Sequence, residues 1–214
     1  MANEDDEIQG HRHARGIFYE SDVLGYVKTL CPRDQVIVDA GANVGNHAVF
    51  FDKVCGAHRV YVFEPNPPAQ EVLFVNSTLN DCQAVDTTFV EYAVADEPGV
   101  FAPGVMNPYN WGGTRMAPKA DGTIAGVRLD DALAGAEVGL IKLDIEGMEP
   151  VALRGVAGLI QRCKPTLVIE ATPETAPEIR ALLEGFDYRV ERTFSMYGAI
   201  VTVVALPRAI LASP

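Results

Sequence analysis

Short apolar runs alternate along the chain with longer segments in which apolar residues recur at helical spacing. The runs are typical of buried strands. Strands are predicted at 36–40, 59–64, 85–94, 138–143 and 166–170, followed by an antiparallel pair at 186–194 and 198–206. Helices are predicted at 19–30, at 45–55, from Pro67-Pro68 to about Leu79, after 143 to about Arg162, and at about 175–184. The alternation predicts an α/β fold with a mostly parallel sheet, an antiparallel last strand, and helices on both faces.

Two parts of the chain depart from this alternation. Residues 1–15 form a polar leader that we expect to be disordered, and residues 16–214 are expected to form one domain. Residues 96–123 are rich in Gly, Pro and Asn, have no clear periodicity, and are predicted to be an inserted functional loop or hairpin. Asn110 and Trp111 in this segment are candidate substrate-binding residues. A loop that is simply packed around Trp111 is the alternative.

The chain of 214 residues is acidic, with a formal net charge of −12 and a pI near 4.7. Without a basic patch it is a poor partner for phosphate backbones, so no nucleic-acid binding is expected. No apolar run approaches the length of a membrane span, and no membrane association is expected. The four cysteines are scattered without a CxxC pair, as is typical of reduced thiols. These features predict a cytoplasmic protein and leave its oligomeric state open.

The most informative stretch is Val36–Gly45, an apolar run that ends on Asp39 and turns at once through Gly41 and Gly45. Glycines permit a positive φ and close backbone approach, and the following segment is predicted to be a helix. Further on, a second apolar run ends on Glu64, where nucleoside-binding folds hold ribose hydroxyls. The pair predicts a nucleoside-bearing cofactor. The turn alone suits NAD, FAD, a phosphate or S-adenosylmethionine, although the absence of Lys-Ser or Lys-Thr after it argues against a P-loop.

A second concentration of charge lies between Ile141 and Glu149. Lys142, Asp144 and Glu146 alternate with apolar residues, so a continuous strand would point them to one face. Such charges are costly in a sheet covered on both sides unless they are paired or engaged with a ligand. A structural lysine–carboxylate cluster is one interpretation. The position at a strand end, where α/β folds bind ligands, favours a functional one.

With these motifs the chain resembles the FkbM family of S-adenosylmethionine-dependent methyltransferases. The matching pieces run in family order and cover nearly the whole chain: Gly16–Glu20, Val38–His47, Phe63–Asn66, Leu79–Asn80, Leu129–Asp131, Ile141–Glu149 and Pro165–Glu170. The family often has histidine where this chain has Met148, so no role of an imidazole there is carried over.

The resemblance implies a seven-stranded Rossmann-like class I methyltransferase sheet that binds S-adenosyl-L-methionine and releases S-adenosyl-L-homocysteine. The glycine turn would hold the amino-acid part, Glu64 the ribose, and Ala93 and Val94 the adenine. The predicted cofactor-binding residues are Asp39, Gly41, Asn43, Gly45, Asn46, His47, Glu64, Pro65, Ala93, Val94 and Asp144. Tyr19 and Glu20 are expected to form an acceptor-binding lid. His47 as a helix-surface residue, and Tyr19-Glu20 as an ordinary helix start, are the alternatives.

The implied activity is methyl transfer, mostly to a hydroxyl of a small molecule, natural product or sugar. Asp144 is the candidate base, with Lys142 and Glu146 tuning its charge. An NAD(P)-dependent oxidoreductase is the rival enzyme, although the chain lacks an evident Tyr-x-x-x-Lys pair, and a noncatalytic nucleoside-binding protein is the third interpretation. Paired acids could hold Mg²⁺, and His11 with His13 could suggest a metal. No further ligand cluster is evident, so no metal is predicted.

Overall fold

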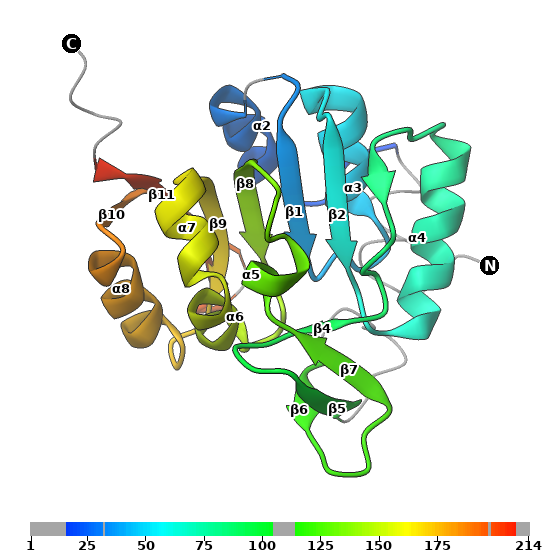
Figure 1. The fold of residues 1–214 in the computed structure, drawn as a ribbon. Helices are drawn as coiled ribbons and strands as arrows, with labels where there is room; N and C mark the ends of the chain where they lie inside the picture. The colour runs from blue at the N-terminus through cyan, green and yellow to red at the C-terminus, as the bar shows by residue number, and fades with distance from the viewer. Residues whose placement is uncertain (1–15, 32, 105–113, 197, 209–214) are drawn as a thin grey trace.

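The computed structural model describes residues 16–31, 33–104, 114–196 and 198–208 (Figure 1). Its centre is a seven-stranded sheet with the order β10-β11-β9-β8-β1-β2-β3. The strands are β1 (Val36–Ala40), β2 (Arg59–Phe63), β3 (Val85–Asp86), β8 (Val138–Leu143), β9 (Thr166–Ala171), β10 (Tyr188–Ser195) and β11 (Val201–Pro207). In this sheet β11 runs antiparallel to both of its neighbours, and the remaining pairs are parallel. The predicted fold class is confirmed.

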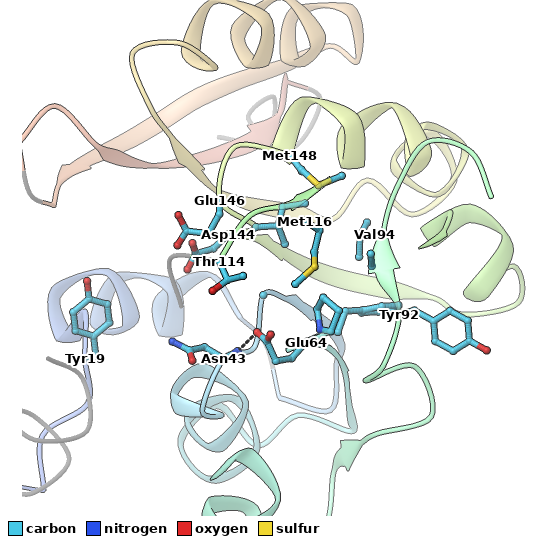
Figure 2. A pocket seen from close by; sticks show the side chains of 15 residues that line it. Tyr19, Asn43, Glu64, Tyr92, Val94, Thr114, Met116, Asp144, Glu146 and Met148 are labelled. Atoms are coloured by element: carbon cyan, nitrogen blue, oxygen red, sulfur yellow. Dashed lines mark hydrogen bonds between the residues drawn. The ribbon is translucent and has the colours of Figure 1, made fainter. Parts of the chain in front are cut away.

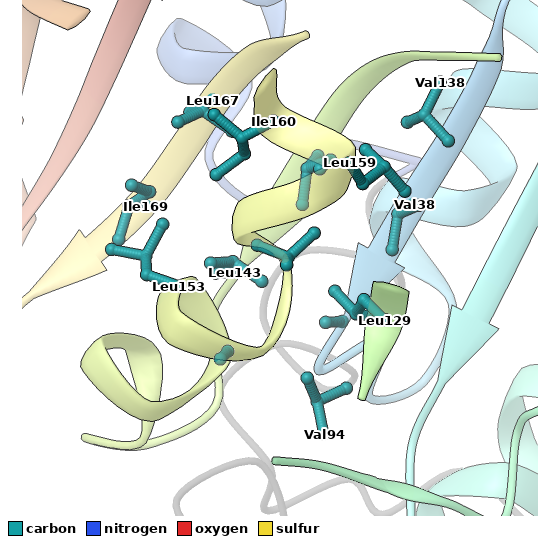
Figure 3. Packing of buried hydrophobic residues seen from close by; sticks show 14 of the residues in the cluster. Val38, Val94, Leu129, Val138, Leu143, Leu153, Leu159, Ile160, Leu167 and Ile169 are labelled. Atoms are coloured by element: carbon teal, nitrogen blue, oxygen red, sulfur yellow. The ribbon is translucent and has the colours of Figure 1, made fainter. Parts of the chain in front are cut away.

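Helices cover both faces of this sheet. They are α2 (Ser21–Leu30), α3 (Asn46–Phe50), α4 (Pro67–Leu79), α5 (Leu129–Ala132), α6 (Glu149–Gly155), α7 (Ala157–Cys163) and α8 (Ala176–Gly185). Successive strand residues point to opposite faces, so in β1 Val38 packs with residues of α5 to α8 and Ile37 with residues of α2 to α4. Figure 3 shows Val38 and Leu143 of the sheet packed with Leu153 and Leu159. Within the described ranges, no helix is long and apolar enough to cross a membrane.

A second, smaller sheet lies beyond the carboxyl ends of β1 and β2 (Figure 1). Its strands, in the order β4-β7-β5-β6, are β4 (Ala93–Val94), β7 (Ile124–Val127), β5 (Gly99–Pro103) and β6 (Met116–Pro118). β5 pairs antiparallel with both β6 and β7. The segment 96–123, which lacks periodicity, therefore contains two short strands, β5 and β6, among its described residues. Asn110 and Trp111 lie outside the described residues.

The prediction of one strand at 85–94 is wrong, because only the two ends of this segment form strands, β3 and β4. β3 contains Val85 and Asp86 alone, and the Asp86 Oδ1 atom then accepts a hydrogen bond from Thr88 N at 3.0 Å. An aspartate that bonds to the backbone two residues on makes a turn that competes with strand pairing. The chain leaves the large sheet here, and β4 joins the small one.

Two predicted helices differ in detail from the structure. The helix expected at 45–55 is α3 followed by a π-helical turn, η2 (Phe51–Cys55). The helix expected after β8 is divided into α6 and α7 at Val156. Just before this division, a Cβ on Gly155 would lie 2.1 Å from the carbonyl oxygen of Ala95. The chain backbone is therefore packed too closely there for a side chain.

The register aligns the carboxyl ends of four neighbouring strands. Ala40 of β1 pairs with Phe63 of β2 and with Leu143 of β8. Leu143 in turn pairs with Ile169 of β9. The residues that follow these positions, in order from β2 through β1 and β8 to β9, are Glu64, Gly41, Asp144 and Glu170. The strand order reverses between β1 and β8, which is the point at which open α/β sheets bind ligands.

Candidate active site

A cavity opens at this row of residues, between the ends of the large sheet and the small sheet (Figure 2). Its lining comes from the turn after β1, the ends of β2 and β8, and strands β4 and β6. The lining residues are Tyr19, Gly41, Asn43, Phe63, Glu64, Pro65, Tyr92, Ala93, Val94, Thr114, Met116, Asp144, Ile145, Glu146 and Met148. The cavity thus combines carboxylates with apolar walls, which suits a ligand that has both polar and apolar parts.

Gly41 lets β1 and β8 come together at the centre of this cavity. Its φ is +79°, and a Cβ added there would lie 1.7 Å from the backbone oxygen of Asp144. Gly45, with a φ of +85°, is the N-cap of α3. Between them Asn43 is also left-handed, with a φ of +47°, which asparagine tolerates better than most residues. The predicted glycine turn is therefore present, and Gly41 is the position where a side chain has no room.

Glu64 is buried and oriented by backbone amides. Its Oε2 atom accepts a hydrogen bond from Asn43 N at 2.8 Å, drawn in Figure 2, and its Oε1 atom accepts one from Asn66 N at 3.0 Å. Burial raises the pKa of Glu64 to about 7, although the two amides act in the opposite direction. Each carboxylate oxygen can accept more than one hydrogen bond, so ligand hydroxyls can still donate to Glu64.

Lys142 is a buried cation that connects three parts of the site. Its Nζ atom lies 3.1 Å from Asp39 Oδ1 and 3.3 Å from Asp144 Oδ2, and it donates a hydrogen bond to the Gly41 carbonyl oxygen at 2.9 Å. Burial by itself would lower the pKa of Lys142, but Asp39 and Asp144 outweigh this and raise it well above its usual range. Lys142 therefore remains charged and serves as an anchor for the strand ends.

The N-terminal segment is attached to the start of α3. The Asn46 side chain accepts a hydrogen bond from Tyr19 N at 2.9 Å and donates one to the Tyr19 carbonyl oxygen at 3.2 Å. Next to it, Glu20 Oε2 lies 3.0 Å from His47 Nε2, and both side chains are buried. Burial would raise the pKa of Glu20, but the His47 imidazole outweighs burial and lowers it. Asn46 and His47 thus fix the segment that brings Tyr19 to the cavity.

A cluster of acids occupies the ends of β8 and β9. One carboxylate oxygen from each of Asp144, Glu146 and Glu170 lies within 4.8 Å of the other two. Figure 2 shows the Asp144 and Glu146 carboxylates beside each other. Burial, followed by the charge of Asp144, raises the pKa of Glu146 to about 7 and that of Glu170 to about 9. Glu146 also has a φ of +57°, a backbone conformation that is costly for a residue other than glycine.

The cavity gathers many of the residues predicted from the sequence. The predicted residues that line it are Tyr19, Gly41, Asn43, Glu64, Pro65, Ala93, Val94, Asp144 and Glu146. Other predicted residues lie next to these along the chain or contact them without lining the cavity, and they are Glu20, Asp39, Gly45, Asn46, His47 and Lys142. The remaining two, Asn110 and Trp111, fall outside the described residues.

Sequence reasoning missed part of the site. The lining residues that it did not assign are Phe63, Tyr92, Thr114, Met116, Ile145 and Met148, and it also missed Glu170 beside the cavity. Thr114 Oγ1 and Asn43 Oδ1 are buried without a hydrogen-bond partner, so both atoms are available to a ligand. A signal for Glu170 did exist, because it ends an apolar run just as Glu64 does.

Solved structures identify the fold of this chain. An S-adenosylmethionine-dependent methyltransferase from Aquifex aeolicus matches with a TM-score of 0.53 and 12% identity, over 88% of this chain and 90% of that chain. An FkbM methyltransferase from Methylobacillus flagellatus KT matches with a TM-score of 0.57 and 20% identity, over 81% of this chain and 43% of that chain. The fold is the Rossmann-like fold of S-adenosylmethionine-dependent methyltransferases.

The family follows from the sequence match. The methyltransferase FkbM domain model matches residues 39–190, and the chain belongs to this family, as the motifs predicted. Hexuronic acid methyltransferase AglP of Haloferax volcanii is 29% identical over 164 residues, which are 73% of this chain and 63% of that protein. The matched region therefore spans less than two thirds of that relative.

Proposed function

We propose that this protein transfers a methyl group from S-adenosyl-L-methionine to a hydroxyl of a small, sugar-like molecule. The observation that carries the proposal is Glu64, a buried carboxylate oriented by two backbone amides in the same cavity as Gly41 and Asp144. A carboxylate held in this way at the end of the second strand suits ribose hydroxyls. Membership of the FkbM methyltransferase family supports the reaction type.

The adenosine part would occupy the side of the cavity formed by the ends of β2 and β4. Glu64 would accept hydrogen bonds from the two ribose hydroxyls. The adenine ring would lie against Pro65, Ala93 and Val94, with Met116 supplying an adaptable apolar surface from the small sheet. This division matches the chemistry of the lining, because the acid lies at the strand end and the apolar residues lie beyond it.

The methionine part would lie at the turn after β1. Gly41 allows a ligand to approach the backbone, and the unpartnered Asn43 Oδ1 is suited to accept a hydrogen bond from the ammonium group. Gly45 makes the turn into α3, while Asn46 and His47 hold the N-terminal segment against it. Asp39 is fully buried and would act through Lys142, which bonds to the backbone of the same turn.

S-Adenosylmethionine supplies an activated methyl carbon, so the main task of the protein is to align the acceptor with it. Asp144 is the residue that would take the proton of the acceptor hydroxyl. Lys142 lies 3.3 Å from Asp144 Oδ2 and fixes the position of this carboxylate. Glu146, beside it, would receive a second hydroxyl. A correctly positioned base contributes about 10²- to 10⁴-fold to the rate.

The acceptor class rests on the polar groups at this end of the cavity. Carboxylates accept hydrogen bonds and Tyr19 and Thr114 both donate and accept them, a set that suits a molecule with several hydroxyls. The related protein from Haloferax volcanii is named a hexuronic acid methyltransferase, which supports a sugar-like acceptor. Asn110 and Trp111 remain candidates for further acceptor contacts.

Calorimetric titration with S-adenosylmethionine, S-adenosylhomocysteine and NAD⁺ tests the cofactor. We expect the first two to bind and NAD⁺ not to bind. Binding of NAD⁺ alone would favour the oxidoreductase alternative. Binding of S-adenosylmethionine without turnover on a panel of sugars and sugar acids would favour a noncatalytic role.

The variant Asp144→Asn tests the role of the base. We expect turnover to fall by about 10²- to 10⁴-fold while the affinity for S-adenosylhomocysteine is retained. The control Asp121→Asn makes the same chemical change at an exposed residue and should leave turnover intact. Unchanged turnover in Asp144→Asn would remove the assignment.

A further inference from the structure

The acid cluster at the ends of β8 and β9 follows from the strand register. Leu143 and Ile169 are paired, and the residues after them, Asp144 and Glu170, stand side by side on neighbouring parallel strands. Glu146 returns to the same point because the chain turns just after β8, with a left-handed φ of +57°. Three carboxylate oxygens thereby come within 4.8 Å of one another.

Glu170 supplies an independent observation, because it is buried and unpartnered. It is only 8% exposed, and among the described residues its carboxylate has no hydrogen bond and no ion pair. Two other buried acids nearby accept hydrogen bonds from backbone amides on at least one oxygen. Glu64 accepts hydrogen bonds from two backbone amides, and Glu149 Oε1 accepts them from Ile145 N and Gly147 N. A largely buried carboxylate beside two others is costly to ionise unless a cation or a proton compensates its charge.

Lys142 does not meet this need. Its Nζ atom is already shared between Asp39, Asp144 and the Gly41 carbonyl oxygen, and its contact with the cluster is to Asp144 Oδ2 alone. Ionised together, Asp39 and the three clustered acids would carry four negative charges opposite the single positive charge of Lys142. A divalent cation compensates more of this charge than a single ammonium group does.

We propose that Asp144, Glu146 and Glu170 bind a divalent cation that prefers oxygen ligands, such as Mg²⁺ or Ca²⁺. Ca²⁺–oxygen distances of about 2.3–2.6 Å place opposite ligands about 4.6–5.2 Å apart, and the corresponding separation for Mg²⁺ is about 4.2 Å. The three oxygens lie within 4.8 Å of one another, a separation compatible with ligands that share one such cation.

The cation would also bind the acceptor, and this step rests on the proposed function. Three carboxylates leave coordination positions open, because both cations take at least six oxygen ligands. Asp144 and Glu146 line the cavity, so the open positions would face it. Neighbouring hydroxyls or a carboxylate of a sugar-like acceptor would fill them. A bridging cation would also let an acidic sugar approach a cluster that otherwise repels it.

The test is direct titration of metal-free protein with MgCl₂, CaCl₂ and MnCl₂ by isothermal calorimetry, with Mn²⁺ also followed by its paramagnetic resonance signal. We expect saturable binding of one ion per chain. The variant Glu170→Gln keeps the side-chain shape and should weaken binding by at least about tenfold. The matched control Glu71→Gln removes the same charge from an exposed position of α4 and should bind as the natural sequence does.

Thermal unfolding separates loss of the site from loss of the fold. Without metal, Glu170→Gln should unfold at the same temperature as the natural sequence or higher, because it relieves repulsion among the acids. Ca²⁺ or Mg²⁺ should raise the unfolding temperature of the natural sequence and of Glu71→Gln by more than that of Glu170→Gln. If Glu170→Gln does not fold, Glu146→Gln provides the same comparison.

Two results would overturn the cation site: no saturable binding up to about 10 mM, which exceeds the range of weak Ca²⁺ sites, or equal affinity in Glu170→Gln and Glu71→Gln. The titration requires neither S-adenosylmethionine nor an acceptor. Metal binding without methyl transfer would therefore leave the site standing and refute the proposed function. Methyl transfer that persists in EDTA, with no metal binding, would support the proposed function and refute the cation site.

Discussion

Substitution of the glycines tests whether the close approach of β1 and β8 builds the cavity. Gly41 and Gly45 are both left-handed, with φ values of +79° and +85°, but they differ in their surroundings. A Cβ on Gly41 would lie 1.7 Å from the Asp144 backbone oxygen, whereas a Cβ on Gly45 would lie 3.2 Å from the Cγ atom of the buried Leu73 side chain. Gly25, in α2, is not left-handed and has nothing within 4 Å of an added Cβ. The three alanine variants therefore separate backbone strain from collision.

The expected free energies of unfolding follow from these contacts. Gly25→Ala should stabilise the protein by about 0.5–1 kcal/mol, because alanine is the better helix former. Gly45→Ala should destabilise it by about 1–2 kcal/mol, which is the cost of a left-handed conformation for an L-residue. Gly41→Ala carries the same cost and also displaces the backbone at Asp144, where overpacking adds about 1–3 kcal/mol. The expected destabilisation of Gly41→Ala is therefore about 2–5 kcal/mol in total.

Urea unfolding followed by circular dichroism would measure these differences, and calorimetry with S-adenosylhomocysteine would measure the effect on the cavity. We expect Gly41→Ala to lose affinity by more than tenfold, about 1.4 kcal/mol, because the strand ends that line the cavity move apart. Gly45→Ala should lose less affinity for S-adenosylhomocysteine, and Gly25→Ala should keep the affinity of the natural sequence. Equal destabilisation by the Gly41 and Gly45 variants, or full affinity in Gly41→Ala, would refute the reasoning.

Two further predictions concern buried charges. Ribose hydroxyls donate to charged Glu64, whose pKa is raised to about 7, so the affinity for S-adenosylhomocysteine should rise with pH up to about 7 and level off above it. Calorimetry across this range should show the rise, and Glu64→Gln should abolish it; a flat profile in the natural sequence would contradict the assignment. Lys142→Met leaves Asp39 buried without its cation and should cost about 3–5 kcal/mol in urea unfolding. The double variant with Asp39→Leu should recover much of that loss, and failure to recover it would show that Lys142 acts mainly through its other contacts.

The strands that build the site could be predicted because their sequence signals are local. Val36–Ala40 and Val138–Leu143 are apolar runs with clear polar boundaries, and the strands predicted there have the same bounds as β1 and β8. Parallel strands end at one edge of a sheet, so the acids that follow such runs had to lie near one another. The sequence therefore predicts that Glu64 and Asp144 lie near each other, and both line the cavity.

The parts that escaped prediction depend on interactions between distant segments or on a single side chain. Residues 85–94 have the composition of a strand, but the bond from Thr88 N to Asp86 Oδ1 turns the chain out of the sheet. The cavity wall at Thr114 and Met116 comes from a small sheet whose strands are too short to show periodicity. Glu170 was visible as a strand end. Its contact with Asp144 became visible only through the register of β8 and β9.

The buried pair of Lys142 and Asp39 is better explained by the groups that it holds in place than by a gain in the free energy of unfolding. The two residues are partners in the register of β1 and β8, and both are almost completely buried. An apolar pair of similar size is often as stable as a buried ion pair, because desolvation offsets most of the attraction. An apolar pair would, however, hold neither the Gly41 carbonyl oxygen nor Asp144. Lys142 contacts both, so it fixes the two strand ends between which the cavity opens.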